Sequence, residues 1–131
     1  TIPLGPPPDN LQRTAAAVEE GMAAVMDSLK AGAIAGDVHA AWQRVLDRYG
    51  LEKKSRIGYS IGTGYAPDWG ERTLSFRPGE TTSVPEDAVV HVILGMWRDD
   101  WGMELSETLH IRGGDCVRMC DFPQHVHVVP A

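Results

Sequence analysis

Two short segments combine tryptophan, glycine and acidic residues, and they are where this sequence offers chemistry. The first begins at 58–62 and leads to Asp68-Trp69-Gly70-Glu71, and the second covers 95–104. Aromatic rings and carboxylates placed together at turn glycines are typical of a recognition or catalytic pocket, because an ordinary core gains nothing from carboxylates. The two segments therefore predict a pocket for a small molecule.

Length and charge limit what that molecule is. A chain of 131 residues supports one domain with a modest core, and its net charge of -6 argues against a nucleic acid or an anionic membrane as partner. A cationic or neutral polar small molecule fits better. The longest apolar run, 88–97, is too short to cross a bilayer. We therefore expect a soluble, cytoplasmic protein.

The two cysteines favour reduced thiols, since a secreted scaffold of this size that depended on disulfides would carry more. A sharper alternative exists, because Cys116, Cys120, His125 and His127 together form a ligand set that zinc accepts. Their spacing is not the usual one of a closed zinc site, and the valines around the histidines suggest a terminal strand instead.

The elements that must position these residues change type along the chain. Residues 1–8 are proline-rich and predict a connector. A capping box that starts at Asp9 and apolar residues at three- and four-residue intervals predict a helix ending at about 30–32. A second helix is expected to have Asp37 as its N-cap and to stop at Gly50.

Alternating patterns predict strands after residue 55. The strand at 57–62 is expected to place Tyr59 and Ile61 on one side and the small residues between them on the other. The apolar segment 88–95 predicts a strand buried on both faces. The segment 103–112 alternates cleanly except at Glu107, which falls among the apolar positions.

Several motifs resemble the later part of the catalytic domain in the creatinase, aminopeptidase P and methionine aminopeptidase superfamily, which has the pita-bread fold. Within it, the double Trp-Gly-acid pattern is similar to the ectoine hydrolase branch, whose members are often described as Xaa-Pro peptidase-like. The segments that carry the resemblance are 5–8, 30–41, 58–62, 67–73 and 95–102. The resemblance covers nearly all of this chain but only the second half of such an enzyme.

The resemblance also indicates where the metal ligands of the peptidase members would fall. The ligand histidine falls on Tyr59 and the first glutamate on Ile93. The second glutamate falls on Ser106, with Glu107 beside it, and a pair of aspartates would precede Thr1. An aliphatic side chain cannot coordinate a metal ion, and a phenol and a hydroxyl are poor ligands. We therefore expect no metal cofactor; the alternative peptidase would need two divalent ions.

The creatinase-like branch cleaves carbon–nitrogen bonds with protein acids and bases alone, so the resemblance implies a similar reaction here. Strand parity puts His91 on the face of Ile93 and Glu104 on the face of Ser106, where the ligands of the superfamily point. His91 and Glu104 are therefore the candidate catalytic residues. The candidates for binding a substrate, by holding its charge or by walling the pocket, are Tyr59, Asp68, Trp69, Glu71, Trp97, Trp101, Ser106 and Glu107.

Each assignment has a structural alternative. His91 is also compatible with a core histidine that a backbone carbonyl satisfies, and Tyr59 with a strand aromatic packed on its neighbours. Asp99 and Asp100 fit a solvated turn. Burial of Glu107 would penalise its charge unless a partner compensates, and a strand bulge would turn it to the polar face instead.

The sequence thus predicts an α+β fold class: half of a pita-bread fold, with two helices packed on a curved, mainly antiparallel sheet over 9–131. The function expected is that of a metal-independent carbon–nitrogen hydrolase resembling ectoine hydrolase, which opens a small cyclic amidine. Its partner is a small amidine or zwitterion, and the full-length parent is expected to be a homodimer. This chain alone is expected to be inactive. The alternatives are a metal-dependent Xaa-Pro aminopeptidase or dipeptidase and a non-catalytic interaction module.

Overall fold

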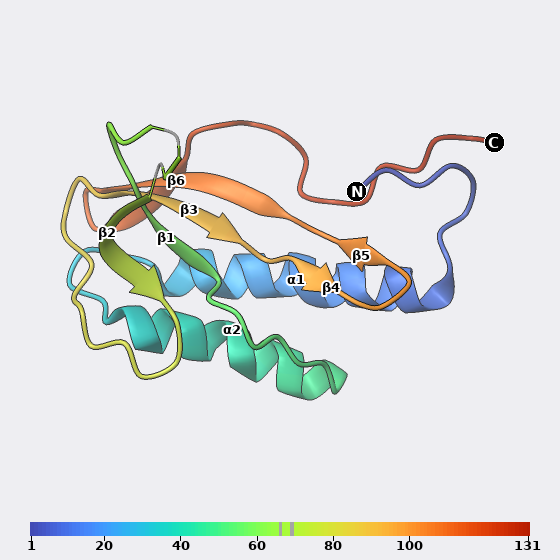
Figure 1. Ribbon diagram of the computed structural model, residues 1–131, viewed down its shortest axis with the longest axis horizontal. Helices are drawn as coiled ribbons and strands as arrows, with labels where there is room; N and C mark the ends of the chain where they lie inside the picture. The colour runs from blue at the N-terminus through green and yellow to red at the C-terminus, as the bar shows by residue number, and fades with distance from the viewer. Residues whose placement is uncertain (66, 69) are drawn as a thin grey trace.

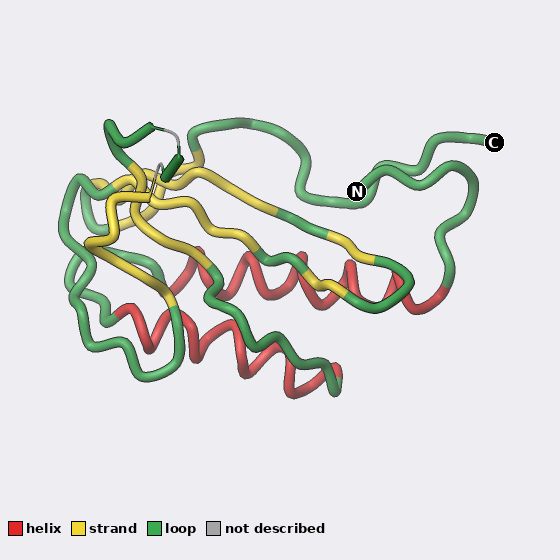
Figure 2. The backbone as a smooth tube through the Cα atoms, viewed as in Figure 1, coloured by secondary structure: helices red, strands yellow, loops and turns green. Residues whose placement is uncertain are grey.

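Two helices cover one face of an antiparallel sheet. The computed structural model describes residues 1–65, 67, 68 and 70–131. Helices α1 (Asp9–Ser28) and α2 (Ala35–Tyr49) lie side by side beneath a sheet of five strands in the order β2-β1-β3-β6-β7 (Figures 1 and 2). All neighbouring strands in that sheet are antiparallel. The predicted α+β class, with two helices packed on a mainly antiparallel sheet, is confirmed.

The strands fall into the large sheet and a separate hairpin. The bounds in the large sheet are β1 (Gly58–Ile61), β2 (Gly70–Phe76), β3 (Val89–Ile93), β6 (Ser106–Arg112) and β7 (Asp115–Arg118). The hairpin joins β4 (Met96–Trp97) to β5 (Gly102–Met103) and continues the line of β3 and β6 (Figure 1).

Helix α1 begins where predicted but is capped differently. Its N-cap is Pro8, which makes no side-chain capping bond, so the capping box at Asp9 is wrong. Gln12 instead donates its side-chain amide to the carbonyl of Pro7 at 2.7 Å. The helix ends at Ser28, earlier than expected, because Leu29 adopts an extended ψ of 99°.

Helix α2 begins two residues before the predicted N-cap. Ile34 is the N-cap, and Asp37 lies in the first turn, where its charge still favours the helix dipole. The early start is possible because loop carbonyls accept the first free amides: Ala35 donates to Thr82 and Gly36 to Glu80. The predicted stop at Gly50 is confirmed, with a left-handed φ of 63° that glycine adopts without strain.

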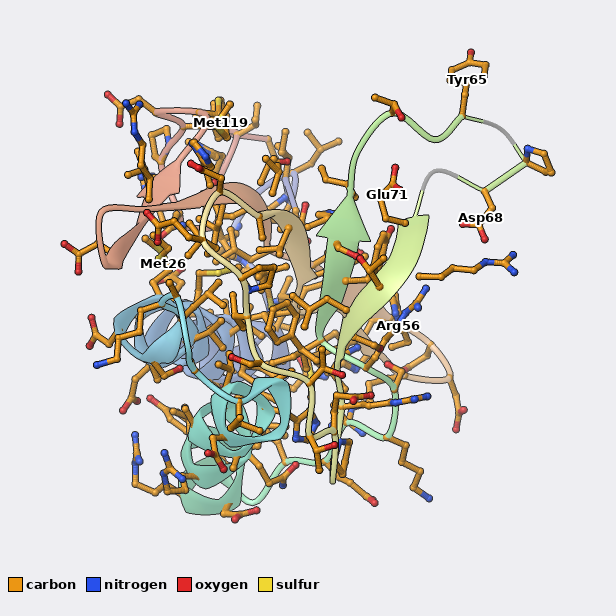
Figure 3. The ribbon with its side chains drawn as sticks, turned by 90° about the vertical axis from the view of Figure 1, so that its left-hand side faces the viewer. Met26, Arg56, Tyr65, Asp68, Glu71 and Met119 are labelled. Carbon is orange, nitrogen blue, oxygen red and sulfur yellow. The ribbon has the colours of Figure 1, made fainter. Side chains whose placement is uncertain are left out.

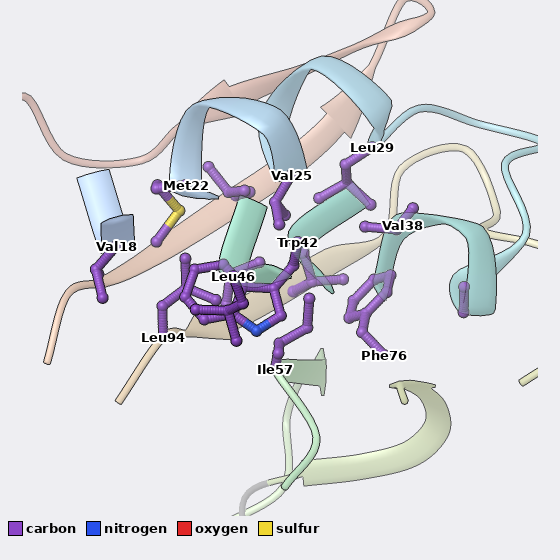
Figure 4. Packing of buried hydrophobic residues seen from close by; sticks show 14 of the residues in the cluster. Val18, Met22, Val25, Leu29, Val38, Trp42, Leu46, Ile57, Phe76 and Leu94 are labelled. Carbon is purple, nitrogen blue, oxygen red and sulfur yellow. The ribbon is translucent and has the colours of Figure 1, made fainter. Parts of the chain in front are cut away.

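The core lies between the helices and the inner face of the sheet. Trp42 and Phe76 are its largest fully buried side chains, and α1 and α2 contribute apolar stripes to it (Figure 4). Other fully buried members include Val18, Met22, Val25, Leu46, Ile57, Val90, Val92, Leu94, Leu109 and Ile111. The apolar periodicity of both helices therefore predicted their buried faces correctly.

The alternation predicted for β1 is confirmed, whereas the burial of β3 differs from the prediction. In β1 the buried positions are Gly58 and Ser60, whereas Tyr59 and Ile61 are half-buried on the outer face. The hydroxyl of Ser60 is satisfied there by Thr73 Oγ1 at 2.8 Å. Strand β3 is fully buried only on its inner face, since its outer residues are half-buried. The outer face of the sheet is therefore free to carry polar side chains.

The first and last residues of the chain run together along the upper side of the molecule (Figure 1). Leu4 pairs with Val129, and the amide of Gly5 donates to the carbonyl of Val129 at 2.7 Å. Within the described ranges, neither helix is both long and apolar enough to span a membrane.

Candidate functional site

Four of the predicted site positions form a row on the outer face of the sheet. Tyr59 pairs directly with His91, and Ile93 pairs directly with Ser106. Residues directly opposite each other on antiparallel strands share a face, and alternate residues of β3 share one too. The predicted parity of His91 and Ile93 is therefore confirmed, whereas Glu104 lies outside the strand that contains Ser106, so strand parity does not place it. Their roles in binding or catalysis stay predictions.

Tyr59 and His91 form a hydrogen-bonded aromatic pair. His91 Nδ1 lies 3.2 Å from the Tyr59 hydroxyl, and the two rings meet edge to face with centroids 5.5 Å apart. The guanidinium of Arg56 lies over the Tyr59 ring, 4.4 Å from its centroid. His91 is thus held by a side chain on the outer face and is not a core histidine.

Burial lowers the pKa of His91 below its ordinary value, and the negative charge of Glu104 partly opposes that shift. The imidazole is therefore neutral near pH 7 and able to accept a proton. Glu104 itself lies in the short link between β5 and β6, and its amide donates to Thr1 Oγ1 at 3.2 Å. The structure thus brings the two predicted catalytic residues within electrostatic reach of each other.

Two adjoining hollows lie beside these residues. Glu104 and Ser106 line a half-enclosed cavity of about 210 Å³, and His91 and Ser106 line a more open hollow of about 360 Å³. Both hollows share a wall formed by Leu105, Ser106, Phe122 and Pro123. A small molecule seated in the cavity would therefore lie next to the hollow that contains His91.

Glu107 lies on the opposite face from His91. The pairing of β3 with β6 is continuous, and Glu107 pairs with the buried Val92. The alternative in which a strand bulge turns Glu107 outward is therefore wrong. Its carboxylate is compensated by Arg118, at 3.1 Å from Nε and 2.9 Å from Nη2, and by the side-chain amide of Gln124 at 2.6 Å. The carboxylate is therefore occupied by protein partners.

The acidic residues of the first Trp-Gly segment hold their own loop. Asp68 pairs with Arg72 at 2.6 Å and accepts the amide of Gly70 at 3.1 Å, and both contacts lower the pKa of Asp68. Glu71 accepts the amide of Gly64 at 3.1 Å. Asp68 and Glu71 lie at the base of a loop that projects from the sheet (Figure 3). Trp69 lies outside the described residues.

The tryptophans of the second segment belong to the β4–β5 hairpin. Trp97 is 66% exposed, and its ring covers the hairpin glycines so closely that a Cβ on Gly95 would lie 2.8 Å from it. Trp101 is half-buried against the core. Neither tryptophan is among the residues that line the cavity or the adjoining hollow. The structure therefore does not gather all the predicted site residues in one place.

Lys53 was not among the predicted site residues. Its ammonium donates to the carbonyl of Gly95 at 2.8 Å and to Ser55 Oγ at 2.7 Å. Burial lowers the pKa of Lys53, and Glu104 partly restores it. In the sequence this residue sits in a run of charged residues that resembles a solvated surface, so no local signal marks it.

The zinc alternative is not supported by the geometry. Both cysteines are free, and the thiol of Cys116 donates to the carbonyl of Met26 at 3.3 Å. Burial raises the pKa of Cys116, which keeps it a thiol. Across the part of the chain that is described, no three His, Cys, Asp or Glu side chains are grouped so that they could hold a metal ion.

A comparison with known protein families assigns this chain to a family. Residues 1–113 match metallopeptidase family M24. The chain belongs to this family. It is 36% identical over 129 residues to the ectoine hydrolase of Halomonas elongata, a match that covers 98% of this chain and 32% of that protein. The chain thus spans about a third of the length of this relative.

Solved structures of the M24 fold resemble the chain closely in shape. The dipeptidase PepE of Mycobacterium ulcerans superposes with a TM-score of 0.88 at 21% identity, covering 98% of this chain and 34% of that one. The X-Pro aminopeptidase of Thermotoga maritima gives a TM-score of 0.85 at 18% identity, covering 98% and 36%. These likenesses confirm the predicted half of a pita-bread fold.

The family assignment corrects one prediction. We expected no metal cofactor, but M24 is a metallopeptidase family whose members typically depend on two metal ions. The donor set of this chain does not by itself fit such a centre. At the expected positions Tyr59 is bonded to His91, Ile93 has no donor atom, and Ser106 offers only a hydroxyl. No chemical step is therefore derived through a metal.

Proposed function

We propose that the full-length protein carrying this chain is a hydrolase that opens a small cyclic amidine, with ectoine as the first substrate to test. The supporting observation is the Tyr59–His91 hydrogen bond, with His91 lining the hollow that adjoins the cavity of about 210 Å³ beside Glu104 and with Glu104 acting on the charge of His91. The identity of 36% to an ectoine hydrolase over nearly the whole chain supports the same reaction class.

In the proposed reaction, water adds to the amidine carbon and one carbon–nitrogen bond breaks. The proposal uses the tautomer of His91 in which Nδ1–H donates to the Tyr59 hydroxyl, so that Nε2 takes a proton from the attacking water. Glu104 pairs with the amidinium and holds its carbon beside that water. The proton then passes to the leaving nitrogen, so the products are an amide and a primary amine.

The domain organisation, oligomeric state and location of the full-length protein are proposed from its resemblance to the M24 enzymes. Residues 9–131 form the C-terminal part of a pita-bread catalytic domain, and 1–8 connect it to an upstream half that completes the site. The chain alone is then inactive. A homodimer, a cytoplasmic location and a small zwitterionic substrate complete this proposal.

The test is turnover of ectoine by the full-length protein, followed by NMR of the ring and of the N-acetylated diamino acid product. His91→Gln and Glu104→Gln should each lower kcat by about 100-fold or more, as expected for removal of a general base or of a charged binding group. The control is His110→Gln, on the outer face of β6 beside Asp87. Unchanged kcat in both variants, or an equal loss in the control, would refute the assignment.

A second candidate is hydrolysis of Xaa-Pro peptides, which the match to a metallopeptidase family favours. It predicts that the full-length protein cleaves Xaa-Pro dipeptides and that this cleavage increases when divalent manganese or cobalt is added. Comparing kcat/KM for ectoine with that for an Xaa-Pro dipeptide in the same preparation separates the two functions.

A further inference from the structure

The cavity beside Glu104 carries carboxylates and imidazoles on an apolar wall. Its apolar lining consists of Ile2, Met103, Leu105, Phe122 and Val126. Its titratable lining consists of two carboxylates, Glu19 and Glu104, and two imidazoles, His125 and His127. A compact molecule with a positive end, a negative end and an apolar body would find a partner in it for each of its parts.

His127 has an unmet hydrogen-bonding capacity. Its Nε2 is fully buried and has no hydrogen-bond partner among the described residues. Its ring makes tilted aromatic contacts with Phe122, with centroids 5.2 Å apart, and with His125, with centroids 4.6 Å apart. A buried polar nitrogen normally finds a partner, and because His127 is also a lining residue of the cavity, a bound group is the candidate partner. Next to two imidazoles, a carboxylate is the best match, since it accepts hydrogen bonds from both.

The segment that carries these rings, 122–127, is fixed by the buried network around Glu107. Arg118 bonds both Glu107 and the carbonyl of Phe122, and Gln124 bonds Glu107. The imidazoles are therefore placed before any ligand arrives, which reduces the entropy lost on binding.

We infer that His127, supported by His125, binds the carboxylate of a zwitterionic substrate whose cationic ring is held by Glu104. The inference rests on the proposed function for the identity of the substrate, but it concerns binding and not turnover. It assigns the segment 122–127 the role of selecting substrates that carry a carboxylate over otherwise identical cations.

The test measures binding by the full-length protein to two probes with calorimetry. The first is ectoine, a cyclic amidine that carries a carboxylate, and the second is the same ring without it, methyltetrahydropyrimidine. His127→Phe keeps the aromatic contact with Phe122 but removes both ring nitrogens. It should raise the Kd for ectoine by about tenfold or more, the scale of a lost hydrogen bond to a charged group, and leave the Kd for the second probe within about twofold.

Two further variants control for folding. His127→Asn retains a side-chain donor and should recover part of the preference for ectoine. His110→Phe makes the same change on β6 outside the cavity and should alter neither Kd. An equal change for both probes in His127→Phe, or no change for either, overturns the inference.

Failure of the proposed function would look different. If the protein binds ectoine with the predicted dependence on His127 but does not open its ring, the carboxylate site stands and the hydrolase proposal fails. If ectoine is turned over with an unchanged KM in His127→Phe, the hydrolase proposal stands and the carboxylate site fails. If ectoine does not bind at all, both fail.

Discussion

Replacing Glu107 by leucine should release the segment that closes the cavity. Glu107 is 7% exposed, and the Arg118 side chain, which is 26% exposed, depends on it for its counter-charge. Removing one partner of a buried ion pair costs about 3 kcal/mol at the lower end of the usual range, which suits a pair with one partly solvated member. Gln124 also loses its acceptor. The cost falls on contacts that hold 119–127 against β6.

Amide hydrogen exchange in the full-length protein measures this cost locally. If segment 119–127 opens independently of the core, about 3 kcal/mol corresponds to exchange that is about 100-fold faster. Replacing both partners, as Glu107→Leu with Arg118→Met, removes the uncompensated charge and should restore most of the protection. The matched control is Glu52→Leu, which breaks an exposed ion pair with Lys54 and should leave exchange of the segment unchanged.

Two results would contradict the predicted role of the Glu107–Arg118 ion pair. Exchange within about threefold of wild type in Glu107→Leu would show that the ion pair contributes little net stability, as surface pairs do. A double variant as unprotected as the single one would show that leucine disrupts packing at this site and that the unpaired charge is not the cause.

Three further predictions follow from the packing and the titrating groups. Gly21→Ala should be strongly destabilising in thermal unfolding, by about 3 kcal/mol or more, because the added methyl would overlap the fully buried ring of Trp42 and both helices would have to move. Burial lowers the pKa of His39, so the unfolded chain binds its proton first and stability should fall as pH drops below about 6.5; His39→Gln should flatten this dependence. Glu104→Gln should lower the pKa of His91 further in an NMR titration, because the carboxylate that stabilises the imidazolium is gone.

The two helices and the shared face of His91 and Ile93 were predictable because the sequence patterns that indicate them are local. Apolar spacing of three and four residues defines one helix face, and the alternation of β3 puts His91 and Ile93 on one side whatever the rest of the chain does. The helix starts were less predictable, since α2 is extended by carbonyls of Glu80 and Thr82, which are distant in sequence. The same holds for Lys53, whose acceptor on Gly95 lies 42 positions away.

The inner and outer faces of β1 could not be predicted from hydrophobicity alone. The buried position 58 requires glycine, because a Cβ there would come within 2.7 Å of the carbonyl oxygen of His91 on the neighbouring strand. Ser60 is buried because Thr73 and the amide of Leu74 satisfy its hydroxyl. Close strand approach and paired hydroxyls thus favour burial of the small residues, and Tyr59 lies on the outer face beside His91.

Glu107 on the inner face of β6 holds the segment 122–127 in place, and Ser106 on the outer face lines the hollows beside that segment. Glu107 points inward and fixes that segment through Arg118 and Gln124, whereas Ser106 and the link at Glu104 face the hollows that the segment closes. Through Arg118 and Gln124, Glu107 therefore supports the segment that forms one wall of the cavity. If so, Glu107→Leu should weaken ectoine binding through His127, and the addition of Arg118→Met should restore affinity together with protection. Recovery of protection without recovery of affinity would show that the wall and the binding site are independent.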